Sequence, residues 1–205
     1  LTEVGAYASI VGIGTQYDMP PFNNSGLLYV KFDDGIKKIP AALLRRCGKL
    51  GMITLPESVE TIEALAFSEC SALPEVELPS GIKTIEAGAF LNDKALKKIS
   101  IPKSLVASSR SVSVIGIGSG TVGPFSGTSI KEATLEDGIV NIPTALFYKC
   151  TKLEKIALPE SVQGINSYAF NGCTVLESIH IPNSVSRIGT GSFGNCSELF
   201  FICSD

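Results

Sequence analysis

The chain has 205 residues and carries 17 basic against 20 acidic side chains, which gives a formal net charge of −3. The two signs are interspersed and no run of lysine or arginine exceeds two residues, which argues against nucleic acid or an anionic membrane as the main partner. The apolar stretches are of strand length and end at proline or glycine, so we expect no membrane-spanning segment. The sequence opens at Leu1 without a signal peptide, and we expect a fragment of a longer precursor.

The sequence repeats a pattern at a constant step, which is visible from Pro56 to Pro79 (79 − 56 = 23) and again from Phe147 to Phe170 (170 − 147 = 23). A fixed period of about 20 to 50 residues is typical of a solenoid, because one turn cannot bury its apolar face alone and the turns must stack. We therefore predict one continuous, β-rich solenoid over residues 1–205.

Residues 51–73 show how one turn is expected to fold. Ile53 and Leu55 alternate with Met52 and Thr54, which predicts a strand that is buried on one face. Pro56 has no N–H for a sheet and is expected to end that strand. The apolar residues of 66–73 have the i, i+3 spacing of a short helical or 3₁₀ turn.

Two residue types recur at inward positions of the repeat. Phenylalanine is expected to form one internal column, made of Phe67, Phe90, Phe147, Phe170 and Phe193. Cysteine also keeps one inward position, at Cys47, Cys70, Cys150, Cys173 and Cys196. Free cysteine packs as a small apolar side chain, so a column of buried thiols is favoured over disulfides and over metal ligation. Asp93 replaces the cysteine of its turn, and Cys203 is expected on an outward strand position.

The repeat is interrupted by a longer turn over 97–130. The interruption contains an apolar glycine-rich segment, 114–118, which repeats residues 10–14, and Phe125 repeats Phe22 at an offset of 125 − 22 = 103. We predict a duplicated block, 1–103 and 104–205, with long irregular turns at 1–27 and 97–130. Insertions in repeat proteins map to loops on one face and often bind partners. The candidate loop residues are Tyr17, Phe22, Ile117 and Phe125.

Segments 53–73, 155–176 and 178–199 resemble the BspA-type leucine-rich repeat, whose pattern is approximately I-x-I-P-x-S-V-x-x-I-x-x-x-A-F-x-x-C-x-x-L. The resemblance covers nearly the whole chain. It implies a right-handed solenoid from secreted or surface-anchored proteins, typical of oral and gut Bacteroidetes and some protozoa. The functions it implies are adhesion to host matrix proteins and to other cells.

The residues give little support to catalysis. His180 is the only histidine, and no nucleophile or orienting acid can be placed beside it, so a surface position is favoured. The glycines at 116, 118 and 120 lack the strand and helix of a phosphate-binding loop. We therefore predict no catalytic residue, no cofactor and no metal site.

The strand alternation instead predicts an extended outward surface. Solenoids use such surfaces for recognition, because each turn offers independent side chains on a rigid ladder. The outward residues of this candidate binding face are Tyr29, Lys31, Met52, Thr54, Glu75, Glu77, Lys98, Ser100, Glu132, Thr134, Lys155, Ser178 and His180.

The sequence favours a non-enzymatic extracellular module that binds a host matrix or cell-surface protein. A structural spacer that holds another domain off the cell surface is one alternative. A glycan-binding face is a second, although the chain contains no tryptophan and only 7% aromatic residues. The apolar segment 200–203 also leaves open an end-to-end dimer through an uncapped stack edge.

Overall fold

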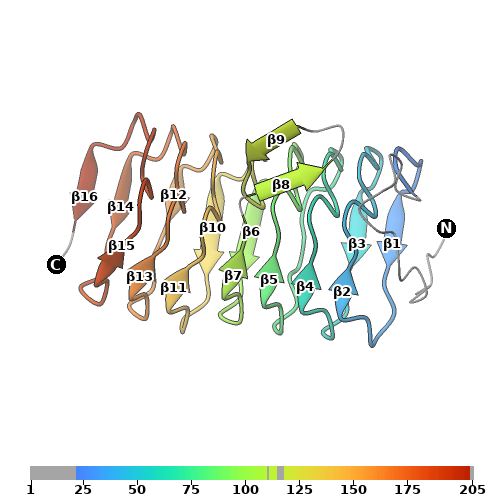
Figure 1. Ribbon diagram of the computed structural model, residues 1–205, viewed down its shortest axis with the longest axis horizontal. Coiled ribbons are helices and arrows are strands. Elements are labelled where there is room, and N and C mark those ends of the chain that lie inside the picture. The colour runs from blue at the N-terminus through green and yellow to red at the C-terminus, as the bar shows by residue number, and fades with distance from the viewer. Residues whose placement is uncertain (1–21, 110, 115–117, 204–205) are drawn as a thin grey trace.

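The computed structural model describes residues 22–109, 111–114 and 118–203, which form a β-solenoid whose turns stack along one axis (Figure 1). Strand partners in neighbouring regular turns keep the step of the sequence repeat, as Tyr29 and Met52 do (52 − 29 = 23). The turns supply short parallel strands to two faces of the stack, and the described residues form no helix. The predicted solenoid and its period are therefore confirmed.

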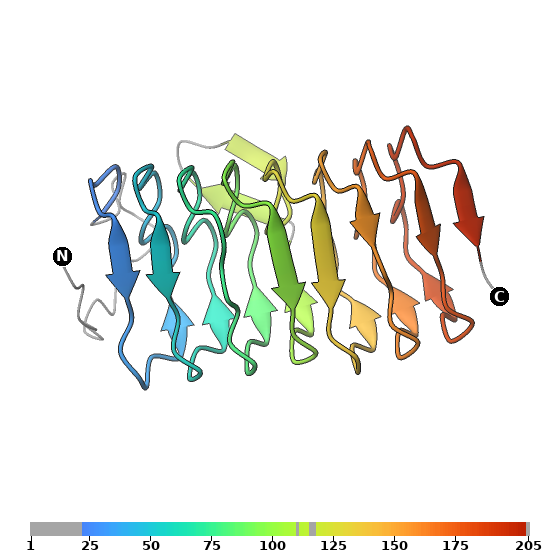
Figure 2. The ribbon, with the colours of Figure 1, turned by 180° about the vertical axis from the view of Figure 1, so that it is seen from behind.

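One face, which we call the long-strand face, is turned toward the viewer in Figure 2. Its strands are β1 (Tyr29–Lys31), β3 (Met52–Thr54), β6 (Lys98–Ile101), β10 (Glu132–Leu135), β12 (Lys155–Ile156), β14 (Ser178–His180) and β16 (Phe201–Cys203). The other, the short-strand face, is made of shorter strands. They are β2 (Lys38–Ile39), β4 (Thr61–Ile62), β5 (Thr84–Ile85), β7 (Ala107–Ser108), β11 (Asn141–Ile142), β13 (Gly164–Ile165) and β15 (Arg187–Ile188).

The long-strand face is divided where a proline interrupts its hydrogen bonds. In the regular ladder the Lys131 N–H donates to the Lys97 carbonyl at 2.9 Å. Pro74 holds the equivalent position and has no N–H to donate, and residues 74–79 form no strand. Glu75 and Glu77, which the sequence analysis placed on a strand, are exposed beside irregular backbone. Pro74 therefore separates β1-β3 from β6-β10-β12, and β14-β16 forms a further sheet on the same face.

The third side of each turn consists of successive tight turns in place of the expected helical or 3₁₀ segment. The Ala66 N–H donates to the Glu63 carbonyl at 3.3 Å, and the Cys70 N–H donates to the Phe67 carbonyl at 3.1 Å. Leu65 and Glu69 have φ angles of 60° and 64°, a left-handed conformation that stops a right-handed helix from propagating.

The phenylalanine column forms as predicted and runs through the core. Its rings stack with centroids 5.2 to 6.2 Å apart, in the order Phe67, Phe90, Phe125, Phe147, Phe170 and Phe193. Phe125 was expected in an insert loop, and that placement is wrong. Its ring is fully buried and joins the two halves of the column, because the insertion precedes it and the stack has already resumed.

The extra residues of the long turn form an antiparallel hairpin of β8 (Ser111–Val114) and β9 (Gly118–Thr121). Figure 1 shows this hairpin lying across the upper side of the stack, along its axis. Immediately after it, the Phe90 N–H donates to the Pro124 carbonyl at 2.8 Å. The insertion therefore leaves the stack and returns without separating the turns on either side.

Candidate binding face

The predicted outward residues lie together on the long-strand face. Backbone register places Tyr29 beside Met52 and Lys31 beside Thr54, and it places Glu132 between Lys98 and Lys155. Because successive side chains of a strand point to opposite sides, the residues between these positions face the core, where Val30 is buried and Ile53 is partly buried. Tyr29 and His180 are half-buried, and the exposed members are Lys31, Met52, Thr54, Glu75, Glu77, Lys98, Ser100, Glu132, Thr134, Lys155 and Ser178.

An exposed apolar patch occupies the first two described turns of this face. Leu28 and Met52 keep 66% and 57% of their surfaces exposed. Tyr29 lies beside them, and its hydroxyl is 3.4 Å from the Thr54 hydroxyl. Sequence alternation identified Tyr29 and Met52 but missed Leu28, which precedes β1 by one residue.

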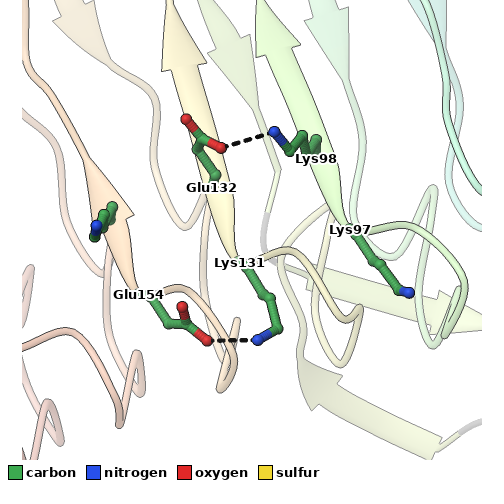
Figure 3. A pocket seen from close by; sticks show the side chains of 6 residues that line it. Lys97, Lys98, Lys131, Glu132 and Glu154 are labelled. Carbon is green, nitrogen blue, oxygen red and sulfur yellow. Dashed lines mark hydrogen bonds and ion pairs between the residues drawn. The ribbon is translucent and has the colours of Figure 1, made fainter.

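A lysine-rich hollow of about 340 Å³ lies farther along the same face (Figure 3). Two cross-strand ion pairs cross it, Lys98–Glu132 at 3.0 Å and Lys131–Glu154 at 2.8 Å. The lining residues, which we call the lysine hollow, are Lys97, Lys98, Lys131, Glu132, Glu154 and Lys155.

The lysine hollow has a local charge of about +2, from four lysines and two glutamates. The hydrogen bond from Lys131 is the main cause that holds the pKa of Glu154 below its ordinary value, and the charges of Lys155 and Lys152 act in the same direction. Glu154 is therefore ionised at neutral pH, and its carboxylate is paired with Lys131.

Half of this hollow was not predicted from the sequence. Lys97, Lys131 and Glu154 stand one residue before the predicted outward row. Alternation alone predicts side chains that point inward at these positions. The available signal was the spacing, because Lys97 and Lys131 are one long turn apart and Lys131 and Glu154 are one regular turn apart (154 − 131 = 23). A charged side chain that recurs at the repeat step marks a solvent-facing column.

The candidate insert residues do not gather into a site. Tyr17 and Ile117 lie outside the described residues. Phe22 is half-buried and packs against the core, and Phe125 is inside the ring column. A binding role for Phe125 is therefore contradicted, since its side chain has no exposed surface.

The cysteine column is built from free thiols. Cys47, Cys70, Cys150 and Cys173 are buried and Cys196 is half-buried. The Cys173 thiol donates to the Phe147 carbonyl at 3.3 Å, and burial raises the pKa of the Cys150 thiol to about 12. These groups are protonated at neutral pH and are poor nucleophiles. The side chain of Cys203 lies outside the described part of the structure.

Within the described ranges, residues 22–109, 111–114 and 118–203, no group of three histidine, cysteine, aspartate or glutamate side chains could hold a metal ion. That part of the chain also offers no helix of the length and apolarity that crossing a membrane requires.

Comparisons with known proteins agree with this architecture. The sequence matches the family described as "BspA type Leucine rich repeat region" in six copies, over residues 16–112 and 118–203. No curated protein matches it.

Solved structures of the same fold come from several bacteria. A leucine-rich repeat protein from Bacteroides ovatus is 27% identical with a TM-score of 0.67, over 86% of this chain and 45% of that one. A T. pallidum leucine-rich repeat protein has the same identity and TM-score, over 84% of this chain and 78% of that one. A leucine-rich cell surface protein from Faecalibacterium prausnitzii is 24% identical with a TM-score of 0.52, over 87% and 60%. The chain thus spans less than half of the Bacteroides ovatus protein.

Proposed function

Since the chain belongs to the BspA-type leucine-rich repeat family, we propose that it is a non-enzymatic extracellular module that binds proteins through its long-strand face. The observation that carries this proposal is the apolar patch of Leu28, Tyr29 and Met52 on a rigid parallel ladder. Aromatic and large apolar side chains contribute most to the energy of protein interfaces, especially where polar residues surround them.

Two further features support the proposal. The charged side chains of the lysine hollow continue the same face, so that an apolar anchor and a polar surface are offered side by side. The repeat pattern resembles that of secreted and surface-anchored proteins, and an extracellular location suits a module whose partner is a host matrix or cell-surface protein.

The test is to replace the apolar patch and measure binding to purified extracellular matrix proteins and to intact cells. Leu28→Asp combined with Met52→Asp should weaken capture at least tenfold, because the anchor side chains are lost and two charges are placed in the interface. The thermal unfolding midpoint of the variant should stay close to that of the parent chain, since both residues are exposed.

The matched control is Val106→Asp combined with Val140→Asp, which changes two exposed apolar residues outside the long-strand face. It should alter capture less than twofold. Equal losses in both variants would contradict a preferred face. Specific hits on a glycan array without hits among proteins would favour the glycan alternative, and no binding to either would favour the spacer.

A further inference from the structure

The lysine hollow contains both paired and unpaired lysines. Ion pairs between neighbouring turns also occur elsewhere on the stack, as Lys37 and Lys83 both meet Glu60 at 2.8 and 2.5 Å. In the hollow, Lys98 and Lys131 form the two ion pairs, and Lys97 and Lys155 take part in neither. Within the described residues no carboxylate lies within ion-pair distance of either lysine.

The backbone register shows why these two lysines stay unpaired. Lys97 stands between Pro74 and Lys131 in its column, so neither neighbour within that column offers it a carboxylate. Lys155 is directly opposite Glu132, but the Glu132 carboxylate pairs with Lys98 on the other side. Figure 3 shows the two ion pairs crossing the hollow, with Lys97 outside both of them.

The two lysines lie on opposite sides of the hollow, two turns apart. Neighbouring parallel strands are about 4.8 Å apart, so the backbone positions of Lys97 and Lys155 are separated by roughly 10 Å. That span matches about three residues of an extended chain, which rises about 3.3 Å per residue. Both side chains are exposed and long enough to reach carboxylates spaced in this way.

We infer that the lysine hollow binds an extended, acidic segment of a protein partner, with Lys97 and Lys155 pairing to carboxylates spaced along it. This inference rests on the proposed function and names the chemistry of the partner at one part of the face.

The surroundings favour an acidic peptide over a sulfated polysaccharide. Glu132 and Glu154 remain inside the hollow and repel a ligand with a charge on every unit, whereas a peptide with spaced carboxylates avoids them. The apolar side chains of Leu28 and Met52 on the same face also need apolar partner groups, which a peptide chain supplies and a sulfated sugar does not. Charge complementarity of this kind mainly sets orientation and the rate of association.

The experiment measures binding of a fluorescein-labelled peptide that carries glutamate at every third position with serine between, and the whole chain is the binding protein. Lys97→Gln combined with Lys155→Gln should weaken binding at least tenfold. The matched control is Lys38→Gln combined with Lys49→Gln, which removes the same charge from exposed positions elsewhere and should weaken binding less than twofold. Added salt should weaken the parent chain's binding, since exposed charge pairs are screened.

Equal weakening by both double variants would overturn the inference, because net charge alone would then explain binding. A third outcome would also overturn the inference. If heparin binds the parent chain but not the Lys97→Gln, Lys155→Gln variant, and the peptide does not bind, the ligand of the hollow is a sulfated polysaccharide. The Leu28→Asp, Met52→Asp variant separates the two proposals. If this variant loses protein capture while the acidic peptide does not bind the parent chain, the inference about the lysine hollow is wrong and the proposed function stands. If the peptide binds at the hollow and no protein is captured, the proposed function fails alone.

Discussion

At the scale of single residues, Asp93 is the most unusual member of the core. It occupies the cysteine position of its turn and its side chain is fully buried. One carboxylate oxygen accepts a hydrogen bond from the Cys70 N–H at 2.8 Å, and the other has no hydrogen-bond partner in the described structure. Burial raises the pKa of Asp93 well above its usual range, the charge of Glu69 adds to the rise, and the Cys70 hydrogen bond opposes it.

Replacing Asp93 by cysteine should stabilise the chain in a pH-dependent way. Below about pH 3.9 the carboxyl is neutral in both states. Above that pH the Asp93 carboxyl ionises in the unfolded chain while it is still protonated in the folded chain. The free energy of unfolding of the parent therefore falls as the pH rises, until the pH passes the pKa of Asp93 in the folded chain. The loss is about 1.4 kcal/mol for each tenfold difference in proton affinity. We expect the gain from Asp93→Cys to be about 1 kcal/mol or more at pH 7 and to shrink toward pH 4.

Denaturant unfolding of both chains at pH 4, 5.5 and 7 measures this difference. Asp93→Asn is the matched control, since it keeps the shape and removes the titration, and its unfolding free energy should follow the flatter pH profile as well. Parallel profiles for the parent chain and Asp93→Asn would contradict a raised pKa.

At the scale of one element, Pro74 separates two sheets that the repeat would otherwise join. Other residues of the column donate their N–H groups to the preceding turn, as Gly51 does to the Leu28 carbonyl at 3.0 Å and Lys131 to the Lys97 carbonyl at 2.9 Å. The turn of Pro74 still packs in the core through Leu73 and Val76. The division is therefore local to the backbone hydrogen bonds and does not interrupt the hydrophobic stack.

Pro74→Ala should restore the missing N–H and allow it to donate to the Gly51 carbonyl. A new hydrogen bond contributes about 0.5 to 1.5 kcal/mol, while loss of the proline costs about 0.4 to 1 kcal/mol through the unfolded chain. The free energy of unfolding should therefore change by less than about 1 kcal/mol. Hydrogen exchange by mass spectrometry should find the new amide protected. Exchange as fast as in an exposed loop would rule out a restored ladder.

At the scale of the whole molecule, each turn depends on neighbours along the axis. Phe170 is stacked on both sides, with ring centroids 5.7 Å from Phe147 and 5.4 Å from Phe193. Phe193 is half-buried and has one ring neighbour in the described column. Stability in such an array is approximately a sum of turn terms and nearest-neighbour terms, so a substitution should cost more inside the stack than near its end.

Phe170→Ala should lower the free energy of unfolding by about 3 to 5 kcal/mol, because it leaves a cavity between two rings. Phe193→Ala should cost less than half as much, since its ring is only partly removed from water. Urea denaturation of the two variants provides the comparison. A cost below about 1 kcal/mol for Phe170→Ala would contradict its place in the column.

The sequence predicted those parts of the fold that repeat. The period, the buried strand positions and the phenylalanine column follow from side chains that recur at the same step. Phe125 was misplaced because the insertion shifts the spacing on either side of it, with 125 − 90 = 35 from Phe90 and 147 − 125 = 22 to Phe147. The left-handed turns also escaped prediction, since Leu65 and Tyr168 are residue types that rarely adopt that conformation.

The candidate site was predictable only in part. Alternation identified Met52 and Lys98 as outward residues, because a strand exposes every second side chain. It could not identify Leu28 or Lys97, which stand just before their strands. Alternation also could not show which lysines lack an ion-pair partner, because this depends on which of the two neighbouring turns each carboxylate pairs with.

The thiol column offers a way to observe the molecule opening. Cys47, Cys70, Cys150 and Cys173 are enclosed at intervals along the axis, and each thiol donates to a carbonyl of the preceding turn. An alkylating reagent can reach such a sulfur only when two neighbouring turns part. The order in which the cysteines become labelled would therefore map, turn by turn, where the stack first separates, and the chain carries these reporters without any added label.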